Sequence, residues 1–297
     1  MWIFLQVLSV AFWAIINVLD SLLVKHYEKH PVVLLWHQSA FSILVLIAGW
    51  IFLEIEIQWM WFFLAAGFLG YIGDLVFFRA LDRIDVSITN IAWALLSVFL
   101  AITGILFLQE TWSVWESFGS FMVFCGILFL SLWQRNIGNV RSLFLLPLLA
   151  SLYVPFYFLQ DLALSHGHDL LSIVFWLLVG REMSSFLIGL LVPQLRRKIF
   201  QSKARVRLSF HVINAGVIAL FFLTTVLTAL SFKLGPLSLV GVIGNVQPFF
   251  VLFFAWLTFT LFPRFAAREV LTLQSISVKV ISFFLVFSGL ALIALAQ

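Results

Sequence analysis

The residues best suited to chemistry in this sequence are ionisable side chains inside long apolar runs. Arg181 and Glu182 are adjacent at the centre of one such run, residues 169–192. An ionised side chain at the centre of a bilayer costs at least about 2.5–3.5 kcal/mol, so it is expected to have a partner or a function. Adjacent helix residues point about 100° apart. We therefore expect that Arg181 and Glu182 do not simply pair with each other, and that at least one meets another helix.

These two residues have a functional and a structural interpretation. In the functional one, Arg181 binds an anionic substrate group or a carboxylate, and Glu182 takes and releases a proton. In the structural one, they belong to an ion pair buried between helices. Asp74, in Gly70-Tyr71-Ile72-Gly73-Asp74, is a candidate partner of Arg181 or ligand of a coupling ion. Asn17 is a further candidate and shares a helix face with Asp20, which is close enough to the helix end for water to reach it.

A second class of candidates consists of uncharged polar and aromatic residues within the apolar runs. These are Asn90, Trp93, Tyr153, Asn245 and Gln247. Pro248 follows Gln247, cannot donate its backbone hydrogen bond and frees a carbonyl one turn earlier, near Gly244. Broken helices of this kind present backbone acceptors at transporter substrate sites. The alternative is that the amides only join helices.

The composition identifies the solvent in which these residues must function. Of the 297 residues, 63% are hydrophobic and 10% are charged, against about 45–50% and about 25% in soluble domains. This excludes an ordinary soluble enzyme and a nucleic-acid-binding chain. The single cysteine cannot form an internal disulfide, and His166 and His168 alone are too few to indicate a metal site. We expect neither a metal nor a cofactor.

Ten apolar runs are long enough to cross a bilayer as helices. They are residues 2–24, 33–53, 60–81, 86–108, 114–133, 143–164, 169–192, 210–232, 237–262 and 276–296. The runs lack the alternation of barrel strands, and the segments between them, Pro193–Ser209 included, are too short to fold as domains. The sequence predicts an all-α, multi-pass integral membrane protein with ten transmembrane helices, and we expect it in the cell or inner membrane.

The charges between the runs predict an orientation. About fifteen of the 17 Lys and Arg residues lie in or beside the loops that follow the odd-numbered runs. The opposite loops carry mostly acidic residues, which are Glu54, Glu56, Glu110, Asp161 and Asp169. Because cationic loops stay in the cytoplasm, both termini are predicted to lie outside. The basic cluster from Arg196 to Arg207 can also contact anionic lipid headgroups.

The runs divide into two groups of five. Leu75–Glu110 and Thr224–Phe259 each contain a helix end, a tight turn, a short polar stretch and a long apolar helix. Residues 1–136 and 137–297 are therefore predicted to be two repeats. An odd number of spans in each repeat gives the two copies opposite orientations, an arrangement found in transporters.

Short motifs along the whole chain resemble the EamA-like branch of the drug/metabolite transporter superfamily. They are Phe12-Trp13-Ala14, Ala80-Leu81-Asp82-Arg83, Glu110, Gly119, Cys125-Gly126, Gly235-Pro236-Leu237-Ser238-Leu239, Val246-Gln247-Pro248-Phe249 and Ser288-Gly289. The resemblance implies a secondary transporter, not an enzyme. Such a protein moves a small metabolite across the lipid bilayer by alternating access, coupled to protons or by exchange, and a homodimer is compatible with it. The substrate class is an amino acid, a nucleoside or an amphipathic drug-like compound.

The chain also departs from the pattern that this family implies. Ser97 stands at the helix-breaking proline of the fourth span, and Leu261 replaces a glutamate at the end of the ninth. The family usually keeps both termini in the cytoplasm, whereas the Lys and Arg count predicts the reverse. The second functional hypothesis is a non-transporting membrane subunit that packs against a partner protein. A filled bundle of this kind should tolerate apolar residues in place of its buried charges.

Overall fold

The computed structural model describes residues 1–83, 91–133, 144–202, 207–261 and 273–296, and all regular structure in these ranges is α-helical. The helices are α1 (Trp2–His26), α2 (Pro31–Phe52), α3 (Met60–Arg83), α5 (Ile91–Phe107), α6 (Val114–Trp133), α8 (Leu145–Ser165), α9 (Leu170–Leu191), α10 (Pro193–Gln201), α11 (Leu208–Leu234), α12 (Leu237–Gly244), α13 (Gln247–Leu261) and α14 (Leu273–Ala296). The predicted all-α class is confirmed.

Seven segments within the described ranges are long and apolar enough to cross a membrane. They are α1, α2, most of α3, α8, α9, α11 and the α12–α13 segment from Leu237 to Thr258. Shorter apolar helices lie at Leu95–Phe107 and Val280–Ala296. The protein is therefore a multi-pass integral membrane protein, as predicted from its composition.

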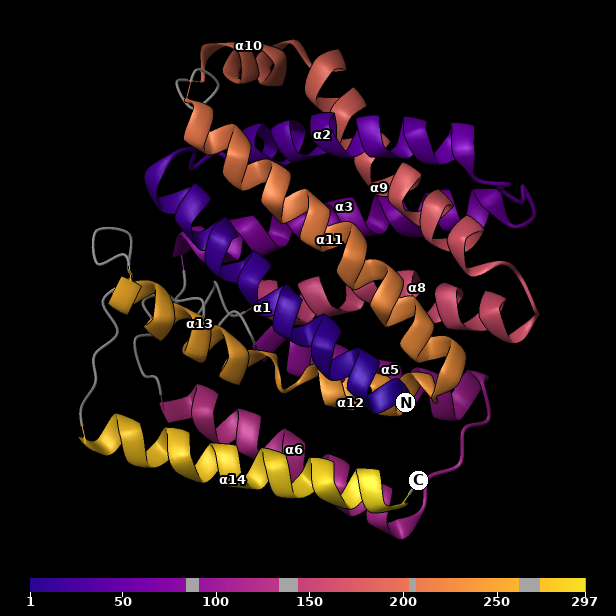
Figure 1. Ribbon diagram of the computed structural model, residues 1–297, viewed down its shortest axis with the longest axis vertical. Helices are drawn as coiled ribbons and strands as arrows, with labels where there is room; N and C mark the ends of the chain where they lie inside the picture. Colours follow the sequence, from indigo (N-terminus) through magenta and orange to yellow (C-terminus); the bar gives the residue numbers. More distant parts are fainter. Residues whose placement is uncertain (84–90, 134–143, 203–206, 262–272, 297) are drawn as a thin grey trace.

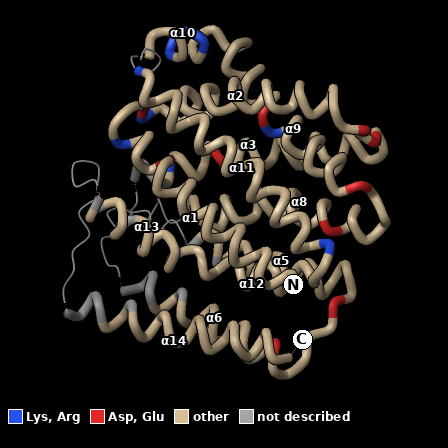
Figure 2. Tube along the Cα trace, in the orientation of Figure 1, with Lys and Arg blue, Asp and Glu red and all other residues tan. Residues whose placement is uncertain are grey.

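The long helices lie side by side with broadly similar axes, and both chain ends are near the same edge of the bundle (Figure 1). Acidic residues gather at that edge, whereas most Lys and Arg lie toward the opposite edge and on α10 (Figure 2). Helix α10 occupies part of the charged segment between the seventh and eighth predicted spans. Three cations follow one another in Arg196-Arg197-Lys198, while Ile199 is buried and packs inward. This two-faced composition suits a helix at the membrane surface.

The ninth predicted span is broken where the sequence expects it. Helix α12 ends at Gly244, and α13 begins at Gln247 with Pro248 in its first turn. At the break, Asn245 N–H donates to the carbonyl of Val242, three residues back, at 3.1 Å. The carbonyl of Gly241 accepts a hydrogen bond from Ser97 of α5 instead, at 2.7 Å. The hydroxyl of Ser97 thus satisfies an acceptor that an unbroken helix would satisfy internally.

Helices α3 and α9 approach each other closely enough to place the buried charges. A Cβ atom added at Gly67 would collide with the backbone of Leu177 and Arg181, and one added at Gly180 would collide with the backbone of Leu64. Both positions therefore require glycine. Asp74 is two turns from Gly67 on α3, so backbone contact at the glycines brings its face of α3 against Arg181.

Candidate functional site

Arg181 of α9 is the centre of a buried ionic cluster. Its Nε donates to Asp74 Oδ2 of α3 at 2.5 Å, and the side chains of Arg181 and Asp74 are 12% and 8% exposed. A second guanidinium nitrogen, Nη1, donates to Glu182, whose side chain is 3% exposed. The expectation that at least one of the two residues meets another helix is confirmed by the bond to Asp74, and the two adjacent residues also pair with each other, which the 100° spacing did not predict. The long arginine side chain lets its guanidinium reach both carboxylates although the two Cβ atoms diverge.

Three further helices complete the surroundings of the ionic cluster. Tyr153 of α8 donates its hydroxyl to Asp74 Oδ1. The guanidinium carbon of Arg181 lies 4.0 Å from the centre of the Phe221 ring on α11, within range of a cation–π contact. Ser39 of α2 hydrogen-bonds to Glu182. Nε and Nη1 of Arg181 therefore donate to carboxylates of the protein, and the Phe221 ring lies over one face of its guanidinium.

A small cavity, which we call the charged cavity, lies beside this cluster, where α1, α2 and α3 meet α9. It has a volume of about 30 Å³. Asn17, Asp20, Gln38, Asp74 and Arg181 contribute its polar walls. Gln38 Nε2 donates to Asp20 Oδ1 at 2.9 Å. Asp20 is 6% exposed, so the prediction of a wetted interfacial residue is wrong.

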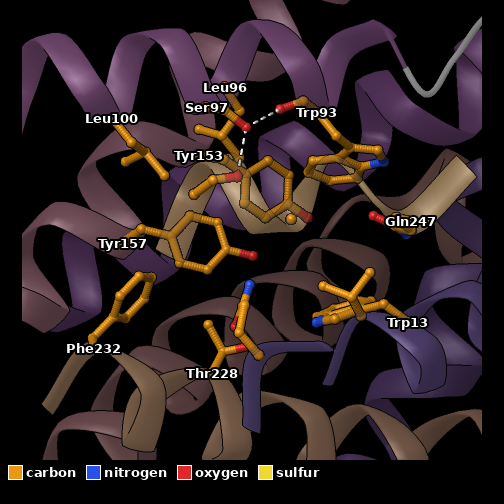
Figure 3. Close-up of a pocket in the computed structure, with 14 residues that line it drawn as sticks. Trp13, Trp93, Leu96, Ser97, Leu100, Tyr153, Tyr157, Thr228, Phe232 and Gln247 are labelled. Carbon is orange, nitrogen blue, oxygen red and sulfur yellow. Dashed lines mark hydrogen bonds between the residues drawn. The ribbon is translucent and has the colours of Figure 1, made fainter. Parts of the chain in front are cut away.

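A larger cavity, which we call the aromatic cavity, has a volume of about 70 Å³. Its walls are Gln6, Val10, Trp13, Trp93, Leu96, Ser97, Leu100, Tyr153, Tyr157, Thr228, Phe232, Gly241, Gly244 and Gln247. The rings of Trp13, Trp93, Tyr153 and Tyr157 surround the opening, and the Tyr157 hydroxyl points into it (Figure 3). None of these lining residues is ionisable near neutral pH.

The two cavities share lining residues with each other and with a third cavity of about 10 Å³. Trp13 and Tyr153 line all three, and Trp93 lines the aromatic and charged cavities. The Trp93 and Tyr153 rings contact each other edge to face, with centroids 5.3 Å apart. Tyr153 therefore has its ring on the aromatic cavity and its hydroxyl on the ionic cluster.

The structure brings six of the predicted site residues together: Arg181, Glu182, Asp74, Tyr153, Asn17 and Trp93. Gln247 lines the aromatic cavity, beside the break at Pro248. Asn245 is buried at the C-terminal end of α12 and is not among the residues that line these cavities. Asn90 lies outside the described residues.

Several lining residues are absent from the predicted set, among them Gln6, Trp13, Ser97, Thr228 and Phe232. The sequence contains a pattern from which Gln6 and Thr228 could have been predicted. Ser9 is three residues after Gln6 in an apolar run, and its hydroxyl contacts that of Thr228 at 2.8 Å. Polar residues recurring at helical spacing on two apolar helices indicate a shared buried face. Nothing in their types distinguishes Trp13 and Phe232 from lipid-facing aromatic residues.

The family resemblance is confirmed for the first part of the chain. Residues 1–132 match the model of the EamA-like transporter family. This is a family of transporters rather than enzymes. No curated protein matches the chain.

The fold has a counterpart among solved structures. One, whose title reads only "Crystal structure of protein", matches 99% of this chain and 96% of its own, with a TM-score of 0.69 and 15% sequence identity. At this identity the likeness concerns the fold alone.

Proposed function

We propose that this protein is a secondary transporter that binds a small metabolite in the aromatic cavity and moves it by alternating access. The observation that carries the proposal is the origin of the cavity walls. Trp13 and Trp93 come from residues 1–136, whereas Tyr153, Thr228 and Gln247 come from residues 137–297. A site shared by two halves is exposed to one side or the other when the halves rock against each other.

The proposal includes ten transmembrane segments in two inverted five-helix repeats. The seven long segments are supplemented by α5, α6 and α14, and the α12–α13 pair counts as one broken span. Most Lys and Arg lie toward the edge opposite both termini (Figure 2), which supports external termini. Glu110 supports the pairing of the halves, because it accepts hydrogen bonds from the backbone N–H and the hydroxyl of Ser238 at the start of α12.

The cavity chemistry favours an uncharged or weakly charged amphipathic substrate. Four aromatic rings offer stacking surfaces, and Gln6, Thr228 and Gln247 offer neutral hydrogen-bonding groups. Arg181 is engaged by Asp74 and Glu182, so an anionic substrate group would have to displace a buried ion pair. A nucleoside-like or amphipathic drug-like compound therefore fits better than an acidic metabolite.

The test is uptake into liposomes that contain the purified protein, measured against a panel of nucleosides, amino acids and amphipathic amines. Each compound is assayed with and without a pH gradient and with and without the same compound inside, which separates proton coupling from exchange. Trp13→Ala should abolish uptake of the accepted compound. Trp256→Ala is the matched control, because Trp256 is 54% exposed on α13 and should leave uptake unchanged. Equal loss in both variants would show that the aromatic cavity is not the binding site.

The non-transporting subunit remains the alternative, and one variant distinguishes it. Replacing Asp74, Arg181 and Glu182 together by apolar residues removes the buried charges without leaving any of them unpaired. A filled bundle should keep its stability and its partner after this change. A transporter whose cluster takes part in the transport cycle should fold and lose uptake.

A further inference from the structure

The charged cavity contains an excess of negative charge in its walls. Among the described residues that line it, Asp20 and Asp74 are carboxylates and Arg181 is the one cation. If all three are ionised, the walls carry a net charge of one negative unit. Glu182 lies outside the lining set and pairs with Arg181 from the other side. The guanidinium of Arg181 therefore already pairs with two carboxylates, Asp74 and Glu182, and Asp20 is a third.

An uncompensated carboxylate in a low-dielectric interior is costly. Asp20 is 6% exposed, and the hydrogen bond that it accepts comes from the neutral amide of Gln38. A neutral donor satisfies one oxygen but supplies no opposite charge. An ionised Asp20 therefore requires a positive charge beyond the guanidinium of Arg181, which Asp74 and Glu182 already engage.

Asn17 is an independent sign of a ligand in the same cavity. It is 3% exposed and lines the cavity, and its amide nitrogen has no hydrogen-bond partner. Buried polar groups without partners are uncommon. The oxygen and nitrogen of a side-chain amide have nearly the same shape, so a rotation of the Asn17 amide by about 180° places its oxygen toward the cavity. Asn17 and Asp20 lie one turn apart on the same face of α1, and both line the charged cavity.

We propose that the charged cavity is a binding site for a monovalent metal cation, Na⁺ in the first instance, with Asp20, Asn17 and Asp74 as oxygen ligands. Carboxylate and amide oxygens are the ligands that hard cations prefer. The charge excess of the walls matches one positive unit. A water molecule needs about 10–15 Å³, so a cavity of about 30 Å³ has room for the ion with one or two waters.

The position of the site couples it to the proposed substrate cavity. Asp74 accepts the hydroxyl of Tyr153, whose ring lines the aromatic cavity. An ion coordinated by Asp74 would change the hydrogen bond between the Tyr153 hydroxyl and Asp74. The ion's use as a coupling ion rests on the proposed transport function, but binding of the ion does not.

Protons compete with the cation for the same carboxylates. The titratable groups around Asp20 are Asp74 of α3, Tyr153 and Tyr157 of α8, and Arg181 and Glu182 of α9. On α2, the titratable residue is His37, next to Gln38. Cation binding should therefore be strongest where the carboxylates are ionised and should weaken on acidification.

The experiment measures thermal unfolding of the purified protein in detergent, without substrate, in NaCl, KCl and choline chloride of equal ionic strength, at about pH 8 and about pH 5. At a hundredfold excess of Na⁺ over its dissociation constant, the unfolding midpoint at the higher pH should rise by roughly 5–10 °C relative to choline. The rise should disappear in Asp20→Asn. Asp161→Asn is the matched control, because it removes a carboxylate of α8 that is not among the residues lining the cavity, and it should keep the rise.

Each other outcome overturns the proposal. Equal midpoints in the three salts at both pH values exclude a metal-ion site. A midpoint that follows pH but not the cation shows that protons alone neutralise the cavity, and a rise that persists in Asp20→Asn places the ion elsewhere. If Asp20→Asn does not fold, Asn17→Ala takes its place and should also lose the rise. Because no transport is measured, failure of the ion site and failure of the transporter proposal are distinguishable.

Discussion

Replacing Arg181 by leucine should destabilise the protein strongly. The guanidinium compensates Asp74 and Glu182, and the three side chains are at most 12% exposed. Leucine fills part of the space but leaves two buried carboxylates without a cation. Breaking a buried ion pair by removing one partner typically costs about 3–5 kcal/mol. The loss of the cation–π contact with Phe221 adds to that cost.

The loss of stability in Arg181→Leu can be measured as a decrease in melting temperature. For a chain of this size, each kilocalorie per mole lowers the unfolding midpoint by about 2–4 °C, so Arg181→Leu should melt roughly 10 °C below the native protein. The measurement is thermal unfolding in one detergent at one heating rate, because membrane proteins often unfold irreversibly. Arg196→Leu is the control: Arg196 is an exposed cation on α10 and should shift the midpoint by a degree or two at most.

A double substitution separates charge compensation from loss of packing. Arg181→Leu combined with Asp74→Asn leaves one uncompensated carboxylate instead of two, so it should recover part of the lost stability. Arg181→Leu melting within two degrees of the native protein would refute the reasoning. So would a double variant less stable than the sum of the two single effects.

The remaining predictions concern hydrogen bonding, topology and pH. Tyr153→Phe removes the hydroxyl that donates to Asp74 and should cost about 1.5–3 kcal/mol, and an unchanged thermal midpoint would show that the bond contributes nothing. A reporter that is active only outside the cytoplasm, fused after Gln297, should be active because of the Lys and Arg asymmetry, and activity of a cytoplasmic reporter alone would contradict it. Burial and the ammonium of Lys198, 3.1 Å from its Nε2, lower the pKa of His30 below 6.5. The unfolded chain therefore takes up this proton first, and stability should fall as the pH drops through about 6.5. The acid loss should be smaller in His30→Gln, as measured by thermal midpoints at a series of pH values.

The membrane class and the buried charges could be predicted from sequence because both follow from transfer free energies. Apolar runs of about 20 residues identify spanning helices without any tertiary information. The cost of burying Arg181 predicts a partner, and Asp74 is among the few acidic residues within the apolar runs. The break at Pro248 is local backbone chemistry and was predicted to within a few residues.

The details that could not be predicted depend on side-chain reach and on contacts between distant helices. The pairing of Arg181 with Glu182 depends on how a long, flexible side chain curls, which helical spacing alone does not describe. The surface helix α10 is nine residues long, too short for a periodicity argument. Trp13 lines the aromatic cavity because of the face that α1 turns toward α11 and α13. The apolar pattern of α1 does not specify that face.

In the proposed two-repeat architecture, the distribution of the buried charges constrains how the two halves assemble. Asp20 and Asp74 belong to residues 1–136, whereas Arg181 and Glu182 belong to residues 137–297. Alone, the first half would place two carboxylates in the membrane without a cation. The second half would retain its arginine–glutamate pair but would lose the bond from Arg181 to Asp74. Because a buried charge without a partner is penalised far more than a satisfied one, the first half gains more from association than the second. The interface that holds the cavities is thus also the place where the charge of Asp74 is compensated by Arg181, so a motion between the proposed halves that broke this bond would leave Asp74 buried without its cation.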